Sequence, residues 1–300
     1  MHVDGRTVII TGASSGIGRA TAREFARRRA HVVLAARNRD RLDELAQELA
    51  DFPGRRLVVP TDVTDRLAVE ALARRTVEEF DSVDVLVNNA GVGLFAPIAG
   101  GSLDNMHHLF NVNFWGAIQC IQATVPYMRR QRRGHIVNVS SVAGKVAAPY
   151  LGVYSATKFA LTAVSGALRS ELAGTGVHVS TVYPGLTETS FRENMLREVD
   201  VPDVPRYLPS ASAAAVARRI VQAVRWSLRD AYVTPQDFAA VTAYPLAPAF
   251  ADWALRFFWL AAGPRRASPD RAASAYAPAE TLAADAADAA DAAEPNSETP

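Results

Sequence analysis

Residues 7–18 read TVIITGASSGIG, in which an apolar run enters a glycine-rich loop that opens a helix-patterned segment. In such a loop Gly12 permits the tight turn, Gly16 lets the backbone approach a pyrophosphate, and Gly18 lets the helix pack closely. The N-terminus of the helix then faces the anion. Many strand-to-helix turns need glycine only for a positive φ, so the position of this loop between strand and helix is what favours a dinucleotide site. The loop residues that we expect to contact the dinucleotide are Gly12, Ser14, Ser15, Gly16, Ile17 and Gly18.

Apolar runs rich in β-branched residues alternate with helix-patterned segments along the first 235 residues. Runs such as Val8-Ile9-Ile10 are continuously apolar, which suits strands buried on both faces, as parallel sheets require. The segments between the runs are long enough for crossover helices. We therefore predict an α/β fold with a doubly wound parallel sheet of about seven strands in a single domain. The predicted strands span 7–11, 31–36, 57–61, 83–88, 135–140, 177–183 and 231–234, and the predicted helices span 17–28, 39–50, 66–80, 103–132, 153–173 and 211–228.

Composition narrows the class of protein. Hydrophobic residues make up 49% of the 300 residues and charged residues 21%, which is typical of a globular protein. The single cysteine, Cys120, excludes a disulfide framework and a cysteine-built zinc site, and the six histidines show no ligand spacing, so we expect no metal. Residues 1–10 contain no apolar export signal, so we expect a cytoplasmic protein. Residues 1–267 carry 31 basic and 24 acidic side chains, a charge of +7, without basic runs interleaved with aromatics, so nucleic-acid binding is not expected.

The chain divides into three parts. We assign the α/β domain to 1–235, an apolar helical extension to 236–267 and a disordered acidic tail to 268–300. The last segment contains 13 alanines, four prolines, seven acids and one arginine, too few large apolar groups for a core.

The extension is apolar, but Pro245 and Pro248 interrupt it, which leaves no run of ~18 residues to span a membrane. From Pro248 onward a helix places an apolar stripe opposite the pair Asp252 and Arg256. We expect this stripe to pack on the body or on a second subunit, with docking on a membrane surface as the alternative. The stripe residues are Phe250, Trp253, Ala254, Phe257 and Ala261.

The end of the second strand indicates the choice of dinucleotide. A fold that prefers NAD usually places an acid there to hold the ribose 2′-hydroxyl, but here Ala36 occupies the place and Arg37 follows. A guanidinium can hold a 2′-phosphate through a bidentate pair of charge-assisted hydrogen bonds. We predict NADP(H) in preference to NAD(H). The alternative is that Arg37, like Arg39 and Arg41, is a solvated residue at a helix start.

Tyr154 and Lys158 lie four residues apart in a helix-patterned segment and so share one helix face. Lysine is rare in this chain: only Lys145 and Lys158 are lysine among 32 basic residues. In order along the chain, Thr11 to Gly18, Asn88-Asn89-Ala90-Gly91, Ser141, Tyr154-x-x-x-Lys158 and Pro184-Gly185 resemble the motifs of the short, single-domain branch of the short-chain dehydrogenase/reductase family. The resemblance covers about residues 5–235 and implies a Rossmann-type fold.

The resemblance also implies a role for each residue of a catalytic group. Tyr154 would pass a proton to the substrate oxygen as hydride moves from the cofactor. Lys158 would favour the phenolate of Tyr154 as a nearby cation and bond the nicotinamide ribose. Ser141 would hold the carbonyl oxygen. Asn113 would anchor a water that relays protons to Lys158, and Asn111 is the nearby alternative.

Other matching positions imply cofactor contacts. Near the adenine these are Asp62 and Val63. Along the cofactor and over the nicotinamide they are Asn89, Ala90, Gly91, Pro184, Gly185, Thr187 and Thr189.

The candidate walls of the substrate cleft are largely apolar and include no convergent Arg or Lys, which favours a hydrophobic ketone, aldehyde or secondary alcohol. Residues 186–210 contain three prolines and are expected to form a mobile lid. We expect an NADPH-dependent carbonyl reductase; an NAD(P)-dependent alcohol dehydrogenase and a non-catalytic NADPH-binding scaffold remain alternatives. The resemblance implies a homodimer or homotetramer built on helices 103–132 and 153–173. The expected wall residues are Leu94, Phe95, Val142, Tyr150, Leu151, Leu186, Phe191 and Met195.

Overall fold

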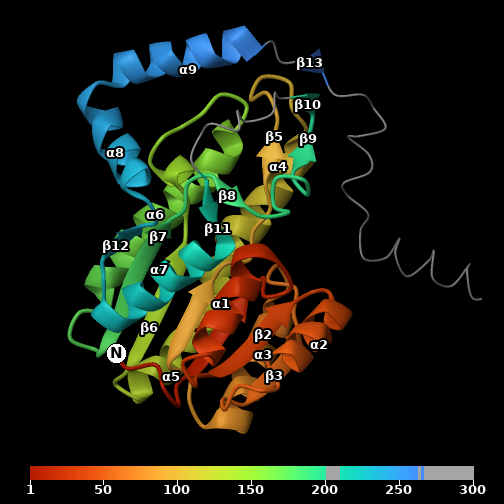
Figure 1. Cartoon of the computed structure of the whole chain (residues 1–300), viewed down its shortest axis with the longest axis vertical. Helices are drawn as coiled ribbons and strands as arrows, with labels where there is room; N and C mark the ends of the chain where they lie inside the picture. Colours follow the sequence, from red (N-terminus) through yellow and green to blue (C-terminus); the bar gives the residue numbers. More distant parts are fainter. Residues whose placement is uncertain (201–209, 263–264, 267–300) are drawn as a thin grey trace, which may run out of the picture.

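The computed structural model describes residues 1–200, 210–262 and 265–266 (Figure 1). Its centre is one seven-stranded sheet in the order β12-β7-β6-β4-β1-β2-β3, with every neighbouring pair parallel. The chain runs from β1 outward to β3 and then returns to the other side of β1, so the order reverses between β1 and β4. This confirms the predicted doubly wound sheet, and it places a topological switch point beside the glycine loop. The strands are β1 (Thr7–Thr11), β2 (His31–Ala36), β3 (Arg56–Pro60), β4 (Val85–Asn88), β6 (Gly134–Val139), β7 (Val177–Tyr183) and β12 (Asp230–Tyr232).

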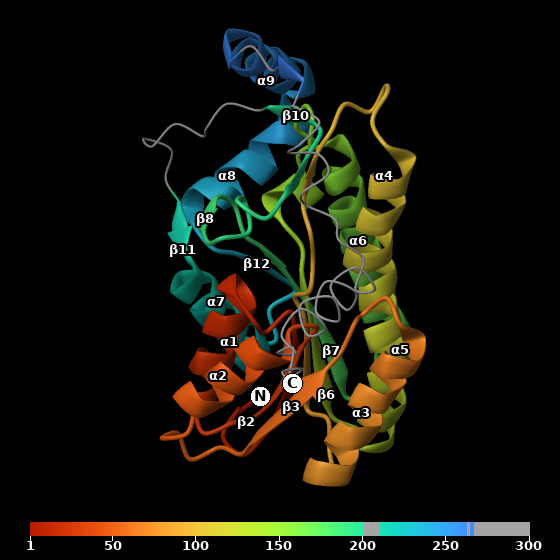
Figure 2. The ribbon, with the colours of Figure 1, turned by 90° about the vertical axis from the view of Figure 1, so that its right-hand side faces the viewer.

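Helices cover both faces of the sheet, as Figure 2 shows. One face carries α1 (Gly16–Ala26), α2 (Arg39–Glu48) and α7 (Ala213–Trp226). The other carries α3 (Arg66–Phe80), α5 (Gly116–Arg130) and α6 (Gly152–Glu171).

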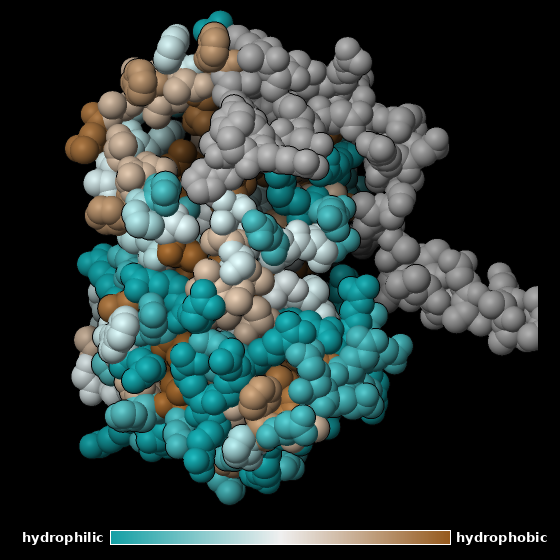
Figure 3. Space-filling model, in the orientation of Figure 1, coloured by the Kyte–Doolittle hydropathy of each residue, from teal (hydrophilic) through white to brown (hydrophobic). Residues whose placement is uncertain are grey.

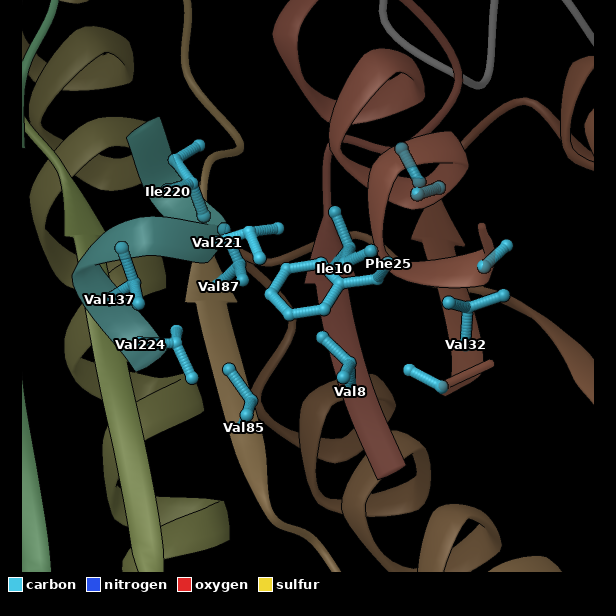
Figure 4. Close-up of a cluster of buried hydrophobic side chains, with 14 of the residues drawn as sticks. Val8, Ile10, Phe25, Val32, Val85, Val87, Val137, Ile220, Val221 and Val224 are labelled. Carbon is cyan, nitrogen blue, oxygen red and sulfur yellow. The ribbon is translucent and has the colours of Figure 1, made fainter. Parts of the chain in front are cut away.

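Successive side chains of each strand point to opposite faces of the sheet, so each strand contributes to the hydrophobic core on either face. In β1, Val8 and Ile10 face the layer of α1 and α7, whereas Ile9 faces the layer of α3 and α5, and all three are fully buried. Figure 4 shows Phe25 of α1 beside Val8 and Ile10. Burial on both faces explains why the sequence of this strand is continuously apolar.

The prediction of one uninterrupted helix over 103–132 is wrong, because a π-helical turn divides it. The segment consists of α4 (Leu103–Phe110), a π-helical turn η1 (Asn111–Trp115) and α5. A π turn inserts one extra residue into the helix and re-aims the side chains on it, frequently at a functional site. Here it turns Asn113 inward, where it is buried, and leaves Asn111 exposed.

Short strands close the carboxyl end of the sheet. β5 (Leu94–Phe95) pairs with β9 (Leu196–Arg197), and β8 (Thr187–Glu188) pairs with β11 (Ala211–Ser212). The segment 186–200, expected as part of a mobile lid, is therefore tied to the body by strand pairing. Pro202, Pro205 and Pro209 of that expected lid, and the expected acidic tail over 268–300, lie outside the described residues.

The extension forms an arch above this end of the molecule. After β12 come α8 (Pro235–Ala243), the 3-10 turn η3 (Tyr244–Leu246) and α9 (Pro248–Ala262), and β13 (Arg265–Arg266) pairs with β10 (Val199–Asp200). The stripe of α9 was expected to pack on the body or on a second subunit. The first expectation is wrong for its three aromatic residues, which are exposed because α9 lies across the top of the molecule and away from the sheet (Figure 1), and packing on a second subunit stays a prediction. No helix in the described ranges is long and apolar enough to span a bilayer.

Candidate active site

The glycine loop is held by the end of β4. Gly12 and Gly16 adopt φ of +66° and +50°, a region that favours glycine. The Asn89 side-chain amide donates to the Thr11 and Gly12 carbonyls at 3.0 and 3.3 Å, and the Thr11 hydroxyl accepts the Asn89 and Ala90 N–H groups at 3.0 and 3.1 Å. Thr11 and Asn89 therefore fix the loop. Sequence reasoning placed Asn89 only against the cofactor and assigned no role to Thr11.

The same loop forms a cradle for an anionic group. A Cβ on Gly12 would lie 2.9 Å from Ala90 Cα, and a Cβ on Gly18 would overlap the Gly12 carbonyl, so the backbone stays uncovered only with glycine. At the N-terminus of α1 the side chain of Ser15 makes no capping bond within the described chain, which leaves first-turn N–H groups for a ligand. These features fit the pyrophosphate of a dinucleotide. Thr189 lies over the loop, with its methyl carbon 3.4 Å from the Cβ position of Gly16.

Tyr154 and Lys158 lie in the first two turns of α6, and both are buried. Lys158 Nζ lies 5.9 Å from the centroid of the Tyr154 ring and donates to the Val139 carbonyl at 3.0 Å. The other lysine, Lys145, lies instead over the Tyr183 ring, 5.4 Å from its centroid. Of the two lysines, Lys158 is therefore the one beside Tyr154.

Burial controls the ionisation of this pair. Burial raises the pKa of Tyr154 to about 12, although a hydrogen bond with Ser141 acts in the opposite direction. Burial also lowers the pKa of Lys158 to about 8. The expected depression of the Tyr154 pKa by the lysine cation is not found, because desolvation of the phenol dominates and the ammonium is bonded to Val139. Tyr154 consequently carries its proton at neutral pH.

Ser140 and Ser141 directly follow β6 but have different surroundings. Ser141 Oγ accepts the Ala143 N–H at 3.1 Å in the 3-10 turn η2 (Val142–Gly144), donates to the Pro184 carbonyl at 3.3 Å and bonds Tyr154. Ser140 is buried and bonds the Lys158 carbonyl at 3.1 Å, so it ties β6 to α6. Of the two hydroxyls, that of Ser141 faces Tyr154.

Asn113 clamps the segment after β4 to the helices. Its amide oxygen accepts the Val92 N–H at 2.8 Å, and its amide nitrogen donates to the Val92 carbonyl at 2.9 Å and to Thr157 Oγ1 at 3.2 Å. A Cβ on Gly91 would lie 3.1 Å from Asn113 Oδ1 and 3.6 Å from Lys158 Nζ, so the three residues converge. Thr157, inside the Tyr-x-x-x-Lys motif, had no assigned role in the sequence.

The residues predicted to bind the adenosine part of the cofactor lie at the ends of β2 and β3. Arg37 is exposed and forms no ion pair with a described carboxylate, whereas Arg39 pairs with Asp43 at 3.4 Å. Asp62 accepts the N–H and hydroxyl of Thr64 at 2.9 and 2.7 Å.

The helices that follow β4 also reach this end of the site. Val63 packs on Gly116 at the start of α5, where a Cβ would lie 2.7 Å from Val63 Cγ2. His108 of α4, which sequence reasoning set aside, lies within electrostatic reach of Arg37 and Asp62, and its pKa is lowered by burial and by Arg37.

The loop after β7 contacts the extension. The Thr187 hydroxyl donates to the Gly185 carbonyl at 3.1 Å, and the Pro184 carbonyl accepts the Val142 N–H at 2.9 Å. Asp237 of α8 lies against Gly185 and forms a capping box with Thr234. Sequence reasoning missed this contact, although Thr234-Pro235-x-Asp237 is a recognisable helix start.

Apolar side chains surround Tyr154 in two adjoining clusters. The ring of Phe191 lies 6.1 Å from that of Tyr154, and the Met195 side chain fills the space beside Gly93. The clusters contain six of the eight expected wall residues, while Val142 and Leu186 lie outside them: the six are Leu94, Phe95, Tyr150, Leu151, Phe191 and Met195.

The family of this fold and site is shown by comparison with known proteins. The sequence model of the family described as short chain dehydrogenase matches residues 6–200. The chain belongs to the short-chain dehydrogenase/reductase family. It is therefore an NAD(P)(H)-dependent oxidoreductase.

Curated relatives of this short-chain dehydrogenase carry several names. An uncharacterized oxidoreductase of Staphylococcus haemolyticus is 32% identical over 78% of the chain and 99% of its own length. The 3-oxoacyl-[acyl-carrier-protein] reductase of Thermotoga maritima is 36% identical over 68% of the chain and 85% of its own length. The glycine betaine reductase of Emericella nidulans is 37% identical over 78% of the chain, but the match spans only 19% of that longer protein.

Solved structures show the same fold with either dinucleotide. A short-chain dehydrogenase/reductase from Burkholderia phymatum in complex with NAD is 28% identical, with a TM-score of 0.76 over 83% of this chain and 96% of its own. An alcohol dehydrogenase from Thermococcus sibiricus complexed with 5-hydroxy-NADP is also 28% identical, with a TM-score of 0.68 over 76% and 94%. These neighbours support a nicotinamide cofactor.

Proposed function

We propose that this short-chain dehydrogenase reduces hydrophobic ketones or aldehydes with NADPH. The observation that carries the proposal is the position of Tyr154: its hydroxyl is bonded to Ser141, Lys158 Nζ lies beside its ring, and apolar side chains enclose it. A phenol in this position can give its proton to a carbonyl oxygen held at Ser141, which reduction of a carbonyl requires, and the apolar enclosure suits a hydrophobic substrate.

We assign to each residue the role that the resemblance implies, and its position supports that role. When bound, the cofactor supplies the hydride. Ser141 Oγ holds the carbonyl oxygen and stabilises the charge that develops on it, and Tyr154 Oη transfers its proton to that oxygen. Lys158, whose ammonium lies beside Tyr154 and Gly91, binds the ribose hydroxyls and compensates the charge left on the phenolate.

Asn113 acts first as a positioning residue in this proposal. Both hydrogens and the oxygen of its amide are used by Val92 and Thr157, so the water expected at Asn113 would bind its main-chain carbonyl in the π turn. The clamp on Val92 keeps Gly91 open beside Lys158.

The preference for NADPH rests on Ala36 and Arg37. An acid at position 36 would repel a 2′-phosphate, whereas the exposed Arg37 has no described carboxylate partner to compete with one. Asp62 is turned toward Thr64, which limits its repulsion of a phosphate.

The subunit contacts proposed from the resemblance have support on two helices. Trp115 of η1 and Phe159 of α6 are 52% and 41% exposed in the single chain. We infer a homo-oligomer that covers these rings. Light scattering of the full chain, with Trp115→Gln as the variant expected to weaken assembly, tests it; a monomeric wild-type chain would exclude it.

Consumption of NADPH tests the function. The substrates are a medium-chain methyl ketone, its aldehyde counterpart, and pyruvate as the charged comparison. We expect turnover of the two apolar carbonyls, and we expect Tyr154→Phe to reduce it by ~10²–10⁴-fold with NADPH affinity nearly unchanged. Tyr127→Phe, a half-buried tyrosine stacked on Arg130, is the matched control and retains activity. Better turnover of pyruvate, or an active Tyr154→Phe variant, contradicts the proposal.

A further inference from the structure

The extension carries an unusual concentration of exposed apolar side chains. Phe250, Trp253 and Phe257 of α9 are 60–66% exposed, and Leu246 of η3 is 80% exposed. The Phe250 and Trp253 rings stack at 5.7 Å between centroids, and the Trp253 and Phe257 rings at 6.0 Å, so the three rings form one continuous strip, which we call the aromatic strip. Figure 3 shows hydrophobic residues gathered around α8 and α9, whereas the lower body is mostly hydrophilic.

The aromatic strip makes α9 amphipathic. At 100° per residue the three rings fall within about 60° of one another, while the exposed Asp252 and Arg256 lie about 130° and about 90° from the middle of that arc. With 15 residues α9 is roughly 22 Å long, shorter than the ~30 Å hydrocarbon layer of a bilayer. Such a helix suits an orientation in the plane of a lipid surface.

Alternative partners fit the strip less well. The described part of the body does not cover it, since its three rings are 60–66% exposed. A second copy of the chain would bury too little surface on this strip for a stable dimer. Three aromatic side chains of ~150–250 Å² each, at this exposure, offer on the order of 400 Å² per subunit. A stable interface buries ~800 Å² per partner, about twice that area. The exposed Trp115 and Phe159 lie on other helices, those expected to join subunits.

The arch ends on strands that adjoin the candidate active site. Its last strand, β13, pairs with β10. The strand before β10 in the chain is β9, which pairs with β5, and both β5 and β9 contribute to the apolar clusters around Tyr154. Exposed apolar groups continue along this end of the molecule at Ile98 and Leu103. A lipid surface in contact with the strip would therefore lie on the side of the molecule that carries the apolar clusters around Tyr154.

We propose that the aromatic strip of α9 docks this enzyme on a lipid bilayer and that the active site takes substrate dissolved in that bilayer. The second clause rests on the proposed reduction of hydrophobic carbonyls; the first does not. Aromatic insertion rather than charge carries the contact, since residues 236–267 have a net charge of only +1 and residues 268–300 one of −6. Binding is thus expected with zwitterionic lipid and at high salt.

Flotation with phosphatidylcholine vesicles tests the docking on the full chain. We expect the wild-type chain to float with the vesicles at low and high salt, and the variant Phe250→Gln/Trp253→Gln/Phe257→Gln to lose at least tenfold in the bound fraction. Trp226→Gln removes a ring that is 59% exposed at the end of α7 and is the matched control, expected to float like wild type. An unchanged thermal midpoint of the triple variant shows that the body remains folded.

The result that overturns the proposal is equally defined. If the wild-type chain does not float, or if the triple variant floats equally well, α9 is not a docking helix. If the wild-type chain does not float and sedimentation shows that the triple variant dissociates into smaller species, the strip is a subunit interface instead. Flotation requires no turnover, so it separates failure of docking from failure of the proposed reductase function.

Delivery from the bilayer has its own readout. With a long-chain ketone held in vesicles, we expect the triple variant to lose at least tenfold in rate, while its rate on a water-soluble short ketone without vesicles stays at the wild-type value. Equal losses on both substrates would contradict the role in delivery.

Discussion

Asp237 Oδ1 lies so close to Gly185 that a Cβ there would overlap it, so the first helix of the extension is in direct contact with the loop that follows β7. The other carboxylate oxygen, Oδ2, accepts the Thr234 N–H at 2.9 Å, and Asp237 N–H donates to the Thr234 hydroxyl at 3.1 Å. This capping box holds the carboxylate in place. Through Gly185 and the Pro184 carbonyl, which bonds Ser141, α8 supports the candidate catalytic loop.

Gly185→Ala is expected to lower the free energy of unfolding by about 1 kcal/mol, the value of a helix cap, because the new methyl group displaces the Asp237 carboxylate. Asp237→Ala is expected to lower the free energy of unfolding by a similar amount, and the double variant should lose no more than either single variant. Urea unfolding of the wild-type chain and the three variants measures this coupling as a double-mutant cycle. Gly166→Ala is the control, since nothing lies within 4 Å of its Cβ position. Additive losses at 185 and 237 would show that the contact carries no energy.

Loss of the Lys158 charge is expected to limit reduction at high pH. Burial lowers the pKa of Lys158 to about 8, so its ammonium deprotonates above that pH, whereas Tyr154, with a pKa of about 12, keeps its proton. The kcat/KM for reduction should therefore fall by up to tenfold per pH unit above pH about 8. An arginine at position 158 stays charged at high pH. The Lys158→Arg variant should therefore show no fall of kcat/KM above pH about 8, even if its activity is lower at every pH. A wild-type profile that stays level to pH ~10 would refute this role.

Arg37→Asp should weaken NADPH binding by ~10–10²-fold and leave NADH binding nearly unchanged, because only NADPH carries the phosphate that a charge-assisted pair would bind. Titration calorimetry with both dinucleotides measures the two affinities. Arg39→Asp, which loses an exposed pair with Asp43, is the control. Equal losses for both dinucleotides would remove Arg37 from the 2′-phosphate site.

Asn113→Ala is expected to lower the free energy of unfolding by ~1–3 kcal/mol, because Val92 and Thr157 lose buried partners. Activity should fall as well, since Gly91 and Lys158 are positioned by the same clamp. Asn111→Ala, at an exposed site of the same π turn, should be nearly neutral in both assays. The reverse order of effects would favour Asn111 as the functional residue.

Buried His135 should make the protein less stable in weak acid. Burial lowers its pKa to about 3 in the folded state, from the ordinary value of 6.5 that the unfolded chain retains. Below pH 6.5 the unfolded state therefore binds a proton that the folded state does not, and the free energy of unfolding falls by up to ~1.4 kcal/mol per pH unit until the pH approaches 3. Above pH 6.5 the group contributes no pH dependence.

Urea unfolding at pH 7 and pH 5 measures this effect. His135→Gln, which can still bond the Ser180 hydroxyl that His135 Nε2 meets at 2.8 Å, should show a smaller loss between the two pH values. His107→Gln, at an exposed position of α4, should follow wild type. Parallel curves for wild type and His135→Gln would exclude His135 as the source.

The strands and the glycine loop could be predicted because their signals are local. In β1, Val8, Ile9 and Ile10 are apolar in succession, and burial on both faces of a parallel sheet demands that pattern regardless of which helices cover it. Gly12 and Gly16 adopt the positive φ that their turn requires. Tyr154 and Lys158 share a helix face because four residues make about one helical turn.

Other features depended on contacts between distant segments and had no such signal. The π turn that buries Asn113 and exposes Asn111 is stabilised by Val92 and Thr157, 21 and 44 residues away. The high pKa of Tyr154 arises from its enclosure by β5, β9 and Phe191, so a cation four residues away in sequence did not determine it. The contact of Asp237 with Gly185 and the exposed position of the aromatic strip likewise follow from where α8 and α9 leave the sheet. Periodicity and turn chemistry in the sequence thus determined the sheet and the loop, and the resemblance of the motifs to those of the family indicated the candidate catalytic residues. Burial and long-range packing, which exist only in the tertiary structure, decided the ionisation and the support of those residues and the surface that the extension presents.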